Sequence, residues 1–297
     1  MKRAASIFVV LAVASLAAGQ QQTPANQSQP ASQPKSAQGA APAQGKRPPQ
    51  AKTQAEFAAY NVAIGSANDP AAMEKAADDF AAKFPDSELR VLLYKAAMRG
   101  YQNANNGDQM SAMAESVLKL DADDPMALIG AAEVLVERTR DSDLDKDQRW
   151  SRAQKYAQHA LETVDPDTVF PAGTTQEQMD AYKNLLRSSA YSILGALALN
   201  QDKYSDAEGY FHKSIDVYPS QPDPVVVLRL AIALDKQERY PDALKEANRA
   251  VELTQDGTVA GKLARQERDR LVQLTGGIPP ASQPPAGTTQ NTTPPPH

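Results

Sequence analysis

Apolar residues recur at a spacing of three and four from about Thr53 to Leu274, which is the period of a helix with one buried face. No run of alternating apolar and polar residues, typical of a half-buried strand, competes with this period. About eleven helices are therefore expected. Their ranges are Gln54 to Ser66, Pro70 to Phe84, Ser87 to Ala104, Gln109 to Leu120, Pro125 to Thr139, Asp147 to Val164, Gln176 to Asn200, Asp206 to Tyr218, Pro224 to Gln237, Pro241 to Leu253 and Val259 to Leu274. The pattern predicts an all-α fold.

Capping residues mark many of the expected helix starts. Asp69, Asp124 and Asp223 each precede a proline, which fits the first helical position because its missing N–H is not needed there. Three further segments place Glu three residues after Thr or Ser, the spacing of a capping box. They begin at Thr53, Thr174 and Ser205. We expect helices to start directly after these residues.

A set of residues repeats in the C-terminal half of the chain. Tyr204 and Ala207 recur as Tyr240 and Ala243, 36 positions later. Aromatic, small and proline residues stand around the first pair in a fixed order. The set is Tyr191, Leu194, Gly195, Tyr204, Ala207, Phe211 and Pro219. This pattern resembles the tetratricopeptide repeat (TPR). The unit of that family is a helical hairpin that must stack on its neighbours to bury its apolar face.

The resemblance implies an α-solenoid of about five antiparallel helical hairpins, closed by a C-terminal capping helix. It is specific over Ser188 to Thr254 and weaker toward the N-terminus. Gly195 and Ala207 are expected where two helices cross, because a larger side chain would separate them. The aromatic residues of these repeats are expected to fill the core between the layers.

In TPR-type solenoids the first helix of each hairpin lines a concave groove that holds a protein or peptide segment. Carried over onto the two best-matched hairpins, the resemblance implies ten groove residues. They are Ser189, Ser192, Ala196, Leu199, Asn200, Val225, Leu228, Ile232, Asp235 and Lys236. The set has few charges and no clamp for a terminal carboxylate, so a hydrophobic or helical partner segment fits it better. A register shifted by one residue would instead place Leu228 and Ile232 in the core.

The first 19 residues have the layout of a secretory signal peptide. Lys2 and Arg3 precede the apolar run Ile7 to Leu16, and small residues follow as far as Gly19. The run is shorter than the ~20 apolar residues that a spanning helix needs. We expect cleavage, export and no stable membrane insertion afterwards, with a retained anchor as the alternative. The absence of cysteine removes a lipid-attachment site and favours a periplasmic or secreted bacterial protein.

Composition sets the folded body apart from two tails. Residues 20–52 are rich in Gln, Ala and Pro, residues 276–297 are rich in Pro and Thr, and both are expected to be disordered. The body, 53–275, holds 25 of the 31 basic residues and all 36 acidic ones. Its net charge of −11 disfavours nucleic acid as a partner.

The sequence carries no residue pattern typical of catalysis or cofactor binding, so a non-enzyme without a cofactor is expected. His159 and His212 lie in different helices and are expected on polar faces. Residues 141–147 copy the first ligands of a calcium loop, but Lys146 and Arg152 replace its Gly and its last Glu, which favours a solvated acidic loop. Trp150 follows this loop and is expected to pack it down, the alternative being exposure to a partner.

These observations predict an exported, non-enzymatic scaffold that holds another protein or peptide segment in its groove. One alternative is a structural component of a cell-envelope assembly, since the early hairpins also resemble those of periplasmic outer-membrane assembly factors. A broad apolar outer patch would favour that reading. Another alternative is a hydrolase that uses groove carboxylates, for which a cleft with two close, buried carboxylates would be needed.

Overall fold

The computed structural model describes residues 46–276 of the 297-residue chain. Eleven α-helices make up this part of the chain, and it contains no strand. In chain order they are α1 (Gln54–Ile64), α2 (Pro70–Lys83), α3 (Arg90–Asn103), α4 (Gly107–Leu120), α5 (Pro125–Arg138), α6 (Lys146–Asp167), α7 (Gln176–Asn200), α8 (Tyr204–Val217), α9 (Pro224–Lys236), α10 (Tyr240–Glu252) and α11 (Val259–Thr275). The all-α fold predicted from the sequence is confirmed. The expected signal peptide lies outside the described residues, as does most of each tail.

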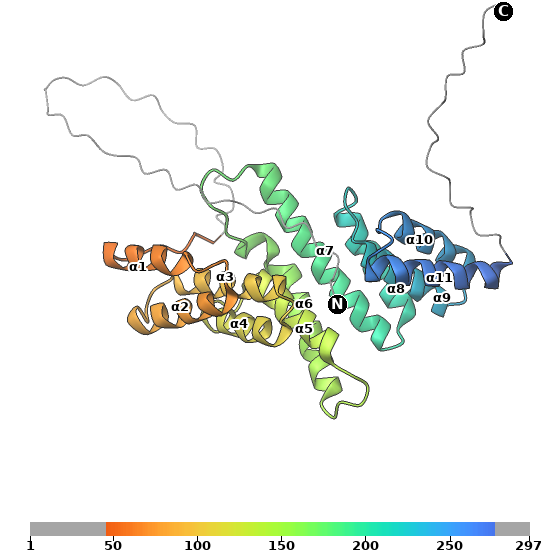
Figure 1. Ribbon diagram of the computed structural model, residues 1–297, viewed down its shortest axis with the longest axis horizontal. Helices are drawn as coiled ribbons and strands as arrows, with labels where there is room; N and C mark the ends of the chain where they lie inside the picture. Colours follow the sequence, from red (N-terminus) through yellow and green to blue (C-terminus); the bar gives the residue numbers. More distant parts are fainter. Residues whose placement is uncertain (1–45, 277–297) are drawn as a thin grey trace, which may run out of the picture.

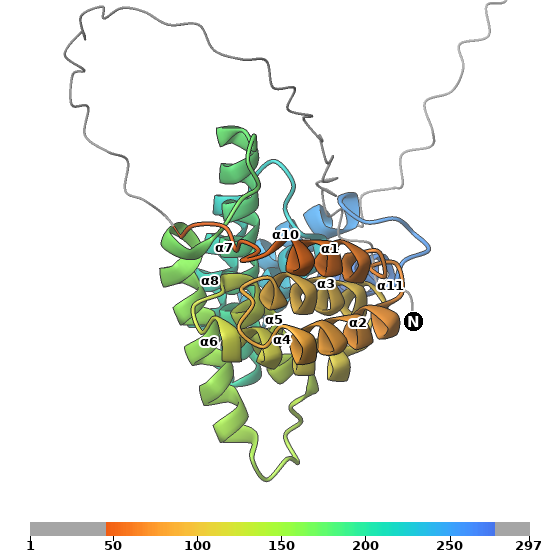
Figure 2. The same cartoon turned by 90° about the vertical axis from the view of Figure 1, so that its left-hand side faces the viewer.

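The helices pair into five antiparallel hairpins, α1–α2 to α9–α10, and the hairpins stack in chain order. Figure 1 shows α1 at one end of the stack and α11 at the other, and Figure 2 views the stack from the α1 end. Each hairpin contacts its neighbours in sequence, and α11 packs against α10 and α9. The α-solenoid and its capping helix are therefore present as predicted.

The hydrophobic core runs through the stack as three clusters of buried side chains. The first includes Leu93 and joins the first two hairpins to α5, the second includes Val164 and joins α5, α6 and α7, and the third includes Phe211 and extends from α7 to α11. Because each cluster spans more than one hairpin, no hairpin buries its apolar face alone.

Three of the five hairpins share one tight turn between their helices. A residue with positive φ stands in each turn, Asn105 (56°), Asp202 (57°) and Glu238 (60°). The N–H of the next residue then donates to the carbonyl five positions earlier, as from Lys203 to Ala198 at 2.9 Å. This left-handed step reverses the chain with few residues, although it is unfavourable for a side chain such as that of Glu238.

Close packing between α7 and α8 explains why Gly195 is a glycine. A Cβ added there would lie 2.5 Å from the ring of Phe211, which is fully buried. Ser188 and Ser214 tie the same two helices together, each hydroxyl donating to the other residue's carbonyl, at 2.9 and 2.8 Å. The predicted helix crossing at Gly195 is confirmed.

Most of the predicted caps are present. The Asp69, Asp124 and Asp223 side chains accept backbone N–H groups of the helices that follow them. The capping box expected from Thr174 lies one residue later, between Thr175 and Gln178.

The cap predicted at Ser205 is wrong. Helix α8 begins at Tyr204, so Ser205 lies inside it, and the N-cap residue Lys203 makes no side-chain cap. The reason is the left-handed turn at Asp202, which directs the chain into the helix one residue earlier than the capping pattern indicates.

The third hairpin departs from the others. Its helices α5 and α6 are joined by the seven residues 139–145, and α6 itself runs for 22 residues. Figure 1 shows this loop, in yellow-green, projecting below the body. The residues preceding α1 also have a defined course. Residues 46–52, assigned to the N-terminal tail by composition, lie against the α2–α3 and α4–α5 loops and the end of α6.

The two ends of the stack expose apolar side chains. Phe57 and Val62 are exposed on α1, and Val259, Leu263 and Leu274 on α11. Within residues 46–276, no helix is both long enough and apolar enough to cross a bilayer.

Candidate functional site

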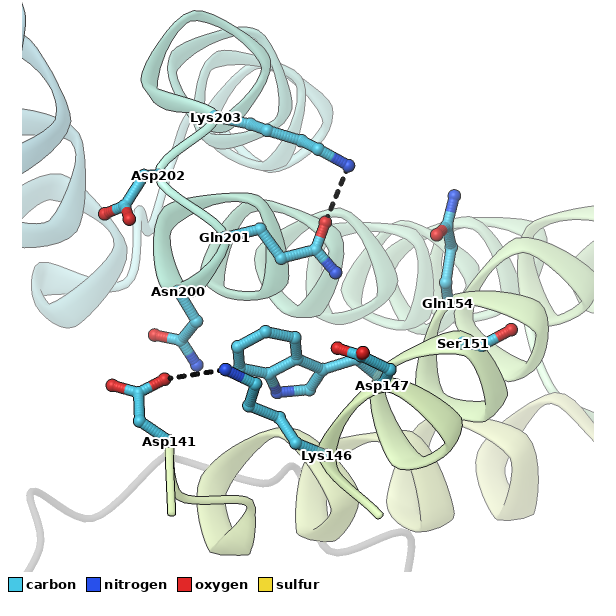
Figure 3. A pocket seen from close by; sticks show the side chains of 10 residues that line it. Asp141, Lys146, Asp147, Ser151, Gln154, Asn200, Gln201, Asp202 and Lys203 are labelled. Carbon is cyan, nitrogen blue, oxygen red and sulfur yellow. Dashed lines mark hydrogen bonds and ion pairs between the residues drawn. The ribbon is translucent and has the colours of Figure 1, made fainter. Parts of the chain in front are cut away.

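An open cleft of about 500 Å³ lies between the third and fourth hairpins (Figure 3). One wall comes from the α5–α6 loop and the first turns of α6, with Asp141, Lys146, Asp147, Trp150, Ser151 and Gln154. The other comes from the end of α7 and the α7–α8 turn, with Asn200, Gln201, Asp202 and Lys203. The cleft exists because the long loop of the third hairpin stands beside the tight turn of the fourth.

Trp150 forms an apolar wall of the cleft. Its side chain is 7% exposed and belongs to the middle core cluster, so the predicted packing role is confirmed. The Lys146 ammonium lies 4.9 Å from the centre of the indole ring, a cation–π contact. The indole N–H is buried without an acceptor among the described residues. A buried donor without a partner costs about 1–3 kcal/mol.

Four polar side chains of the cleft have no hydrogen-bond or ion-pair partner within residues 46–276. They are Asp147, Ser151, Gln154 and Asn200. The remaining polar groups are engaged, as where Lys203 donates to Gln201 at 2.8 Å (Figure 3). Primary amides offer a donor and an acceptor together, which matches the N–H and C=O of an extended peptide. Asp147 adds a negative charge that suits a basic side chain.

The acidic loop that precedes α6 is held by its own cations. Asp145 accepts from Arg149 at 2.8 Å, Asp143 accepts the Arg140 N–H at 2.9 Å, and Lys146 lies 3.5 Å from Asp141. These contacts agree with the solvated acidic loop favoured by the sequence. No group of three or more His, Asp or Glu side chains placed to hold a metal ion occurs in the described part of the chain.

The ten residues assigned to the groove lie on α7 and α9, and their exposure differs widely. Asn200 and Lys236 are exposed, whereas Ala196 and Leu228 are each only 6% exposed and offer little surface to a partner. The others are half-buried. They are Ser189, Ser192, Leu199, Val225, Ile232 and Asp235. Leu228 lies in the C-terminal core cluster, whereas the half-buried Ile232 packs against its surface.

Two of these residues have partners or neighbours that the sequence could not reveal. The Asp235 carboxylate pairs with Arg270 of α11 at 2.6 Å, so the capping helix already uses it. Asn200 lines the cleft beside Trp150, and it alone among the ten does so. Asn200 therefore links the predicted groove to the cleft.

The two histidines of the described chain lie on polar faces. His159 bridges Asp123 at 2.7 Å and Glu162 at 3.1 Å, and its hydrogen bonds to Glu162 and Asp123 raise the pKa of the imidazole. His212 is half exposed and lies 3.9 Å from Glu208 of its own helix. His159 thus connects α6 to the α4–α5 loop.

Sequence reasoning singled out residues 141–147 and Trp150 of the cleft for other reasons, but it missed Ser151, Gln154 and the turn residues 201–203. Ser151 and Gln154 carry no motif, and their proximity to Asn200 arises from stacking of two hairpins 46 or more positions apart in the chain. The one available signal was the length of the segment between Thr139 and Asp147, longer than the turns of the better-matched hairpins.

Comparisons with known proteins return structures but no family. No family model and no curated protein matches the sequence. A solved structure described as "MamA MSR-1 C2" aligns with 63% of this chain and 88% of its own, at 17% identity and a TM-score of 0.42. The structure titled "Functional Characterization of Pseudomonas Aeruginosa pilF" aligns with 76% of this chain and 94% of its own, at 17% identity and a TM-score of 0.47.

A third solved structure is described as "Assembly Chaperone of RpL4 (Acl4) (Residues 1-338)". It aligns with 74% of this chain and 97% of its own, at 10% identity and a TM-score of 0.40.

Proposed function

We propose that this protein is an exported, non-enzymatic TPR-like scaffold that holds an extended segment of a partner protein. The observation that carries the proposal is the cleft between the third and fourth hairpins, which is lined by Trp150 and by four polar side chains without partners among the described residues. Such groups suit the main chain of a peptide, because each peptide unit brings one donor and one acceptor.

The partner segment enters along the exposed end of α7 and reaches the cleft at Asn200. There the amides of Asn200 and Gln154 bind its backbone, Asp147 attracts a basic side chain, and Trp150 provides the apolar wall. A volume of about 500 Å³ lies within the range of pockets that hold small ligands, so a few residues of the segment fit. The half-buried groove residues Ser192 and Leu199 of α7 extend the contact.

Affinity capture with matched variants tests this role. Gln154→Ala with Asn200→Ala removes two unpartnered amides without breaking a contact within the described residues, and we expect it to lose partners captured by the wild type. Gln266→Ala with Gln273→Ala, two exposed residues of α11, is the control and should retain them. Trp150 is the only tryptophan of the chain, so its emission reports directly on occupancy of the cleft. A partner that binds both double variants equally and leaves Trp150 emission unchanged would contradict the proposal.

Export is tested separately by the N-terminus of the native protein. The Lys2-Arg3 start and the short apolar run predict cleavage near Gln20 and a periplasmic or secreted location. Mass spectrometry of the cell-envelope fraction should find the shortened chain. An intact Met1 in a cytosolic fraction would contradict export without affecting the binding role.

A structural role in an envelope assembly is the second candidate. The exposed Phe57 and Val62 on α1 and Val259, Leu263 and Leu274 on α11 favour it, because apolar residues at both ends of a stack suit end contacts. The hydrolase alternative gains no such support. The cleft carboxylate of Asp141 is 90% exposed, whereas a catalytic pair would need burial.

A further inference from the structure

Acidic side chains gather along the edge of the solenoid where consecutive hairpins join. Glu88 lies in the α2–α3 loop, Asp121 follows the last residue of α4, and Asp167 is the last residue of α6. These three residues, here called the acidic edge, come from three successive junctions, and junctions of this type lie on one side of a stack of hairpins. The cleft lies on the opposite side, where the two helices of a hairpin are joined.

Residues 46–50 lie across the acidic edge. The Lys46 ammonium pairs with Asp121 and lies 3.6 Å from Asp167, and its backbone N–H donates to the Pro166 carbonyl at 2.9 Å. The Arg47 guanidinium donates two hydrogen bonds to Glu88, at 2.5 and 2.8 Å. Figure 2 shows the segment, in red-orange, crossing from the end of α6 toward α1.

The contact between residues 46–50 and the acidic edge depends on opposite charges, and its side chains stay largely exposed to solvent. The side chains of Lys46 and Arg47 are 36% and 63% exposed, and ion pairs of that exposure contribute little net stability. Pro48 and Pro49 donate no backbone hydrogen bond and hold the chain extended. A competing segment can therefore replace residues 46–50 on the acidic edge. They stay there largely because the chain tethers them beside it.

Residues 51 and 52, which join this segment to α1, are held by buried contacts. The Lys52 N–H donates to the buried Glu56 at 2.7 Å, and Ala51 packs against the N-terminal core cluster. Glu56 also accepts from the buried Ser87 hydroxyl. Residues 46–50 can leave the acidic edge while residues 51 and 52 stay in place.

We propose that the acidic edge is a docking surface for an extended, Lys/Arg-containing segment of a partner protein, and that residues 46–50 occupy it in the free chain. The chain's own segment shows the chemistry that the surface selects: two adjacent cations followed by an extended backbone. A partner displaces it by making the same ion pairs together with further contacts. The surface is distinct from the cleft, so it stands or falls without the function proposed above.

Release of the segment is measured first, in the full chain. The chain has no cysteine, so a fluorophore on Gln50→Cys reports one position. We expect its anisotropy to fall with added salt, and to fall equally in low salt when Lys46→Glu and Arg47→Glu are introduced. Circular dichroism should be unchanged, because these residues lie outside the helices. A label that stays immobile in the charge-reversed chain overturns the proposal, since the ion pairs then do not hold the segment.

Docking is measured next, with a labelled peptide of residues 44–53. The unlabelled Lys46→Glu, Arg47→Glu chain should bind it at least tenfold more tightly than the wild type, whose edge is occupied. Adding Glu88→Gln and Asp121→Asn should abolish this binding, whereas Gln154→Ala with Asn200→Ala in the cleft should leave it unchanged. A peptide with Glu in place of Lys46 and Arg47 should not bind.

Three results overturn the docking surface. They are equal binding of the peptide to wild-type and charge-reversed chains, no binding to a chain whose segment is shown to be released, and binding that survives the Glu88 and Asp121 changes. A wild-type dimer that exchanges residues 46–50 between copies would assign the edge to a second copy instead of a partner.

Discussion

The third and fourth hairpins share a boundary but are built differently. In the fourth, α7 and α8 are joined by the left-handed turn at Asp202, and Gly195 lets the helices approach until a Cβ would strike Phe211. In the third, the loop 139–145 has no residue with positive φ, and Trp150 fills the space at its base. The special residues of the regular hairpin serve its turn and its helix packing, whereas three of the four unpaired polar side chains of the cleft belong to the irregular hairpin.

This difference shows where a solenoid can place a site. A hairpin with a minimal turn satisfies its own backbone and presents a smooth edge, because its few turn residues bond to one another. A longer loop beside such a turn leaves a recess whose walls belong to two hairpins. Here that recess is the cleft, and its unpaired Gln154 and Asn200 come from different hairpins.

The largest expected effect concerns Trp150, the base of the irregular hairpin. Trp150→Ala should lower the free energy of unfolding by about 3–5 kcal/mol, the usual loss for a buried aromatic side chain. Trp150→Phe keeps most of the ring and removes a buried N–H that has no acceptor, so we expect it to stay within ~1 kcal/mol of the wild type. Denaturant titration measures both.

Phe211→Ala in the fourth hairpin is the comparison, and its loss should match that of Trp150→Ala because Phe211 is also fully buried. If Trp150→Phe were as damaging as Trp150→Ala, the indole N–H would have a stabilising partner such as a bound water. The cleft would then contain one unpaired polar group fewer than described.

The next effect tests the packing of the regular hairpin. Gly195→Leu places a side chain where a Cβ alone would lie 2.5 Å from Phe211, and overpacking should cost about 1–3 kcal/mol. Gly209 of α8 has nothing within 4 Å of an added Cβ, so Gly209→Ala should raise stability by ~1 kcal/mol through helix propensity. Equal effects in chemical denaturation would show that α7 and α8 do not touch as described.

The contrast between hairpins also explains what could be predicted from the sequence. Gly195, Ala207 and Phe211 occupy fixed offsets because close helix packing admits few residue types, so the fold could be predicted from them. The start of α8 could not, because the capping pattern at Ser205 competes with a turn whose only mark is Asp202. Capping patterns therefore identify that a helix begins, but where two local signals compete, the geometry of the preceding turn determines its first residue.

The candidate site was less predictable, for a physical reason. Groove positions inferred from repeat offsets assume regular stacking, and here Leu228 is buried and Asp235 pairs with Arg270 of the capping helix. The contacts of Lys46 and Arg47 depend on an extended segment whose composition alone indicates a solvated tail. Both depend on residues brought together from distant parts of the chain, which carry no local pattern.

A smaller effect on stability is expected from substitutions in the left-handed turn of a regular hairpin and in the longer loop of the third hairpin. Glu238 adopts a left-handed conformation that costs an ordinary residue about 1–2 kcal/mol, so Glu238→Gly should stabilise the protein by about 0.5–1 kcal/mol after the entropy of glycine is counted. Leu144, exposed in the loop of the third hairpin, has no such strain. Leu144→Gly should therefore lower stability by up to ~1 kcal/mol. Thermal melts that move both variants in the same direction would contradict this distinction.

The smallest effect is the pH dependence of a contact found in the third hairpin. His159 connects α6 to Asp123 of the α4–α5 loop, whereas His212 of the fourth hairpin reaches only its own helix. Hydrogen bonds to Glu162 and Asp123 raise the pKa of His159, so the folded state binds its proton more tightly than the unfolded chain does. The contribution to stability is complete below the unfolded pKa of about 6.5 and is lost as pH rises through the folded value. With the His159 side chain 40% exposed, solvent screening limits this contribution to a few tenths of a kcal/mol.

The stability difference between the wild type and His159→Gln should thus shrink from pH 6 to pH 8. Asp123→Asn should reduce the same dependence, and a difference that grows with pH would refute the assignment.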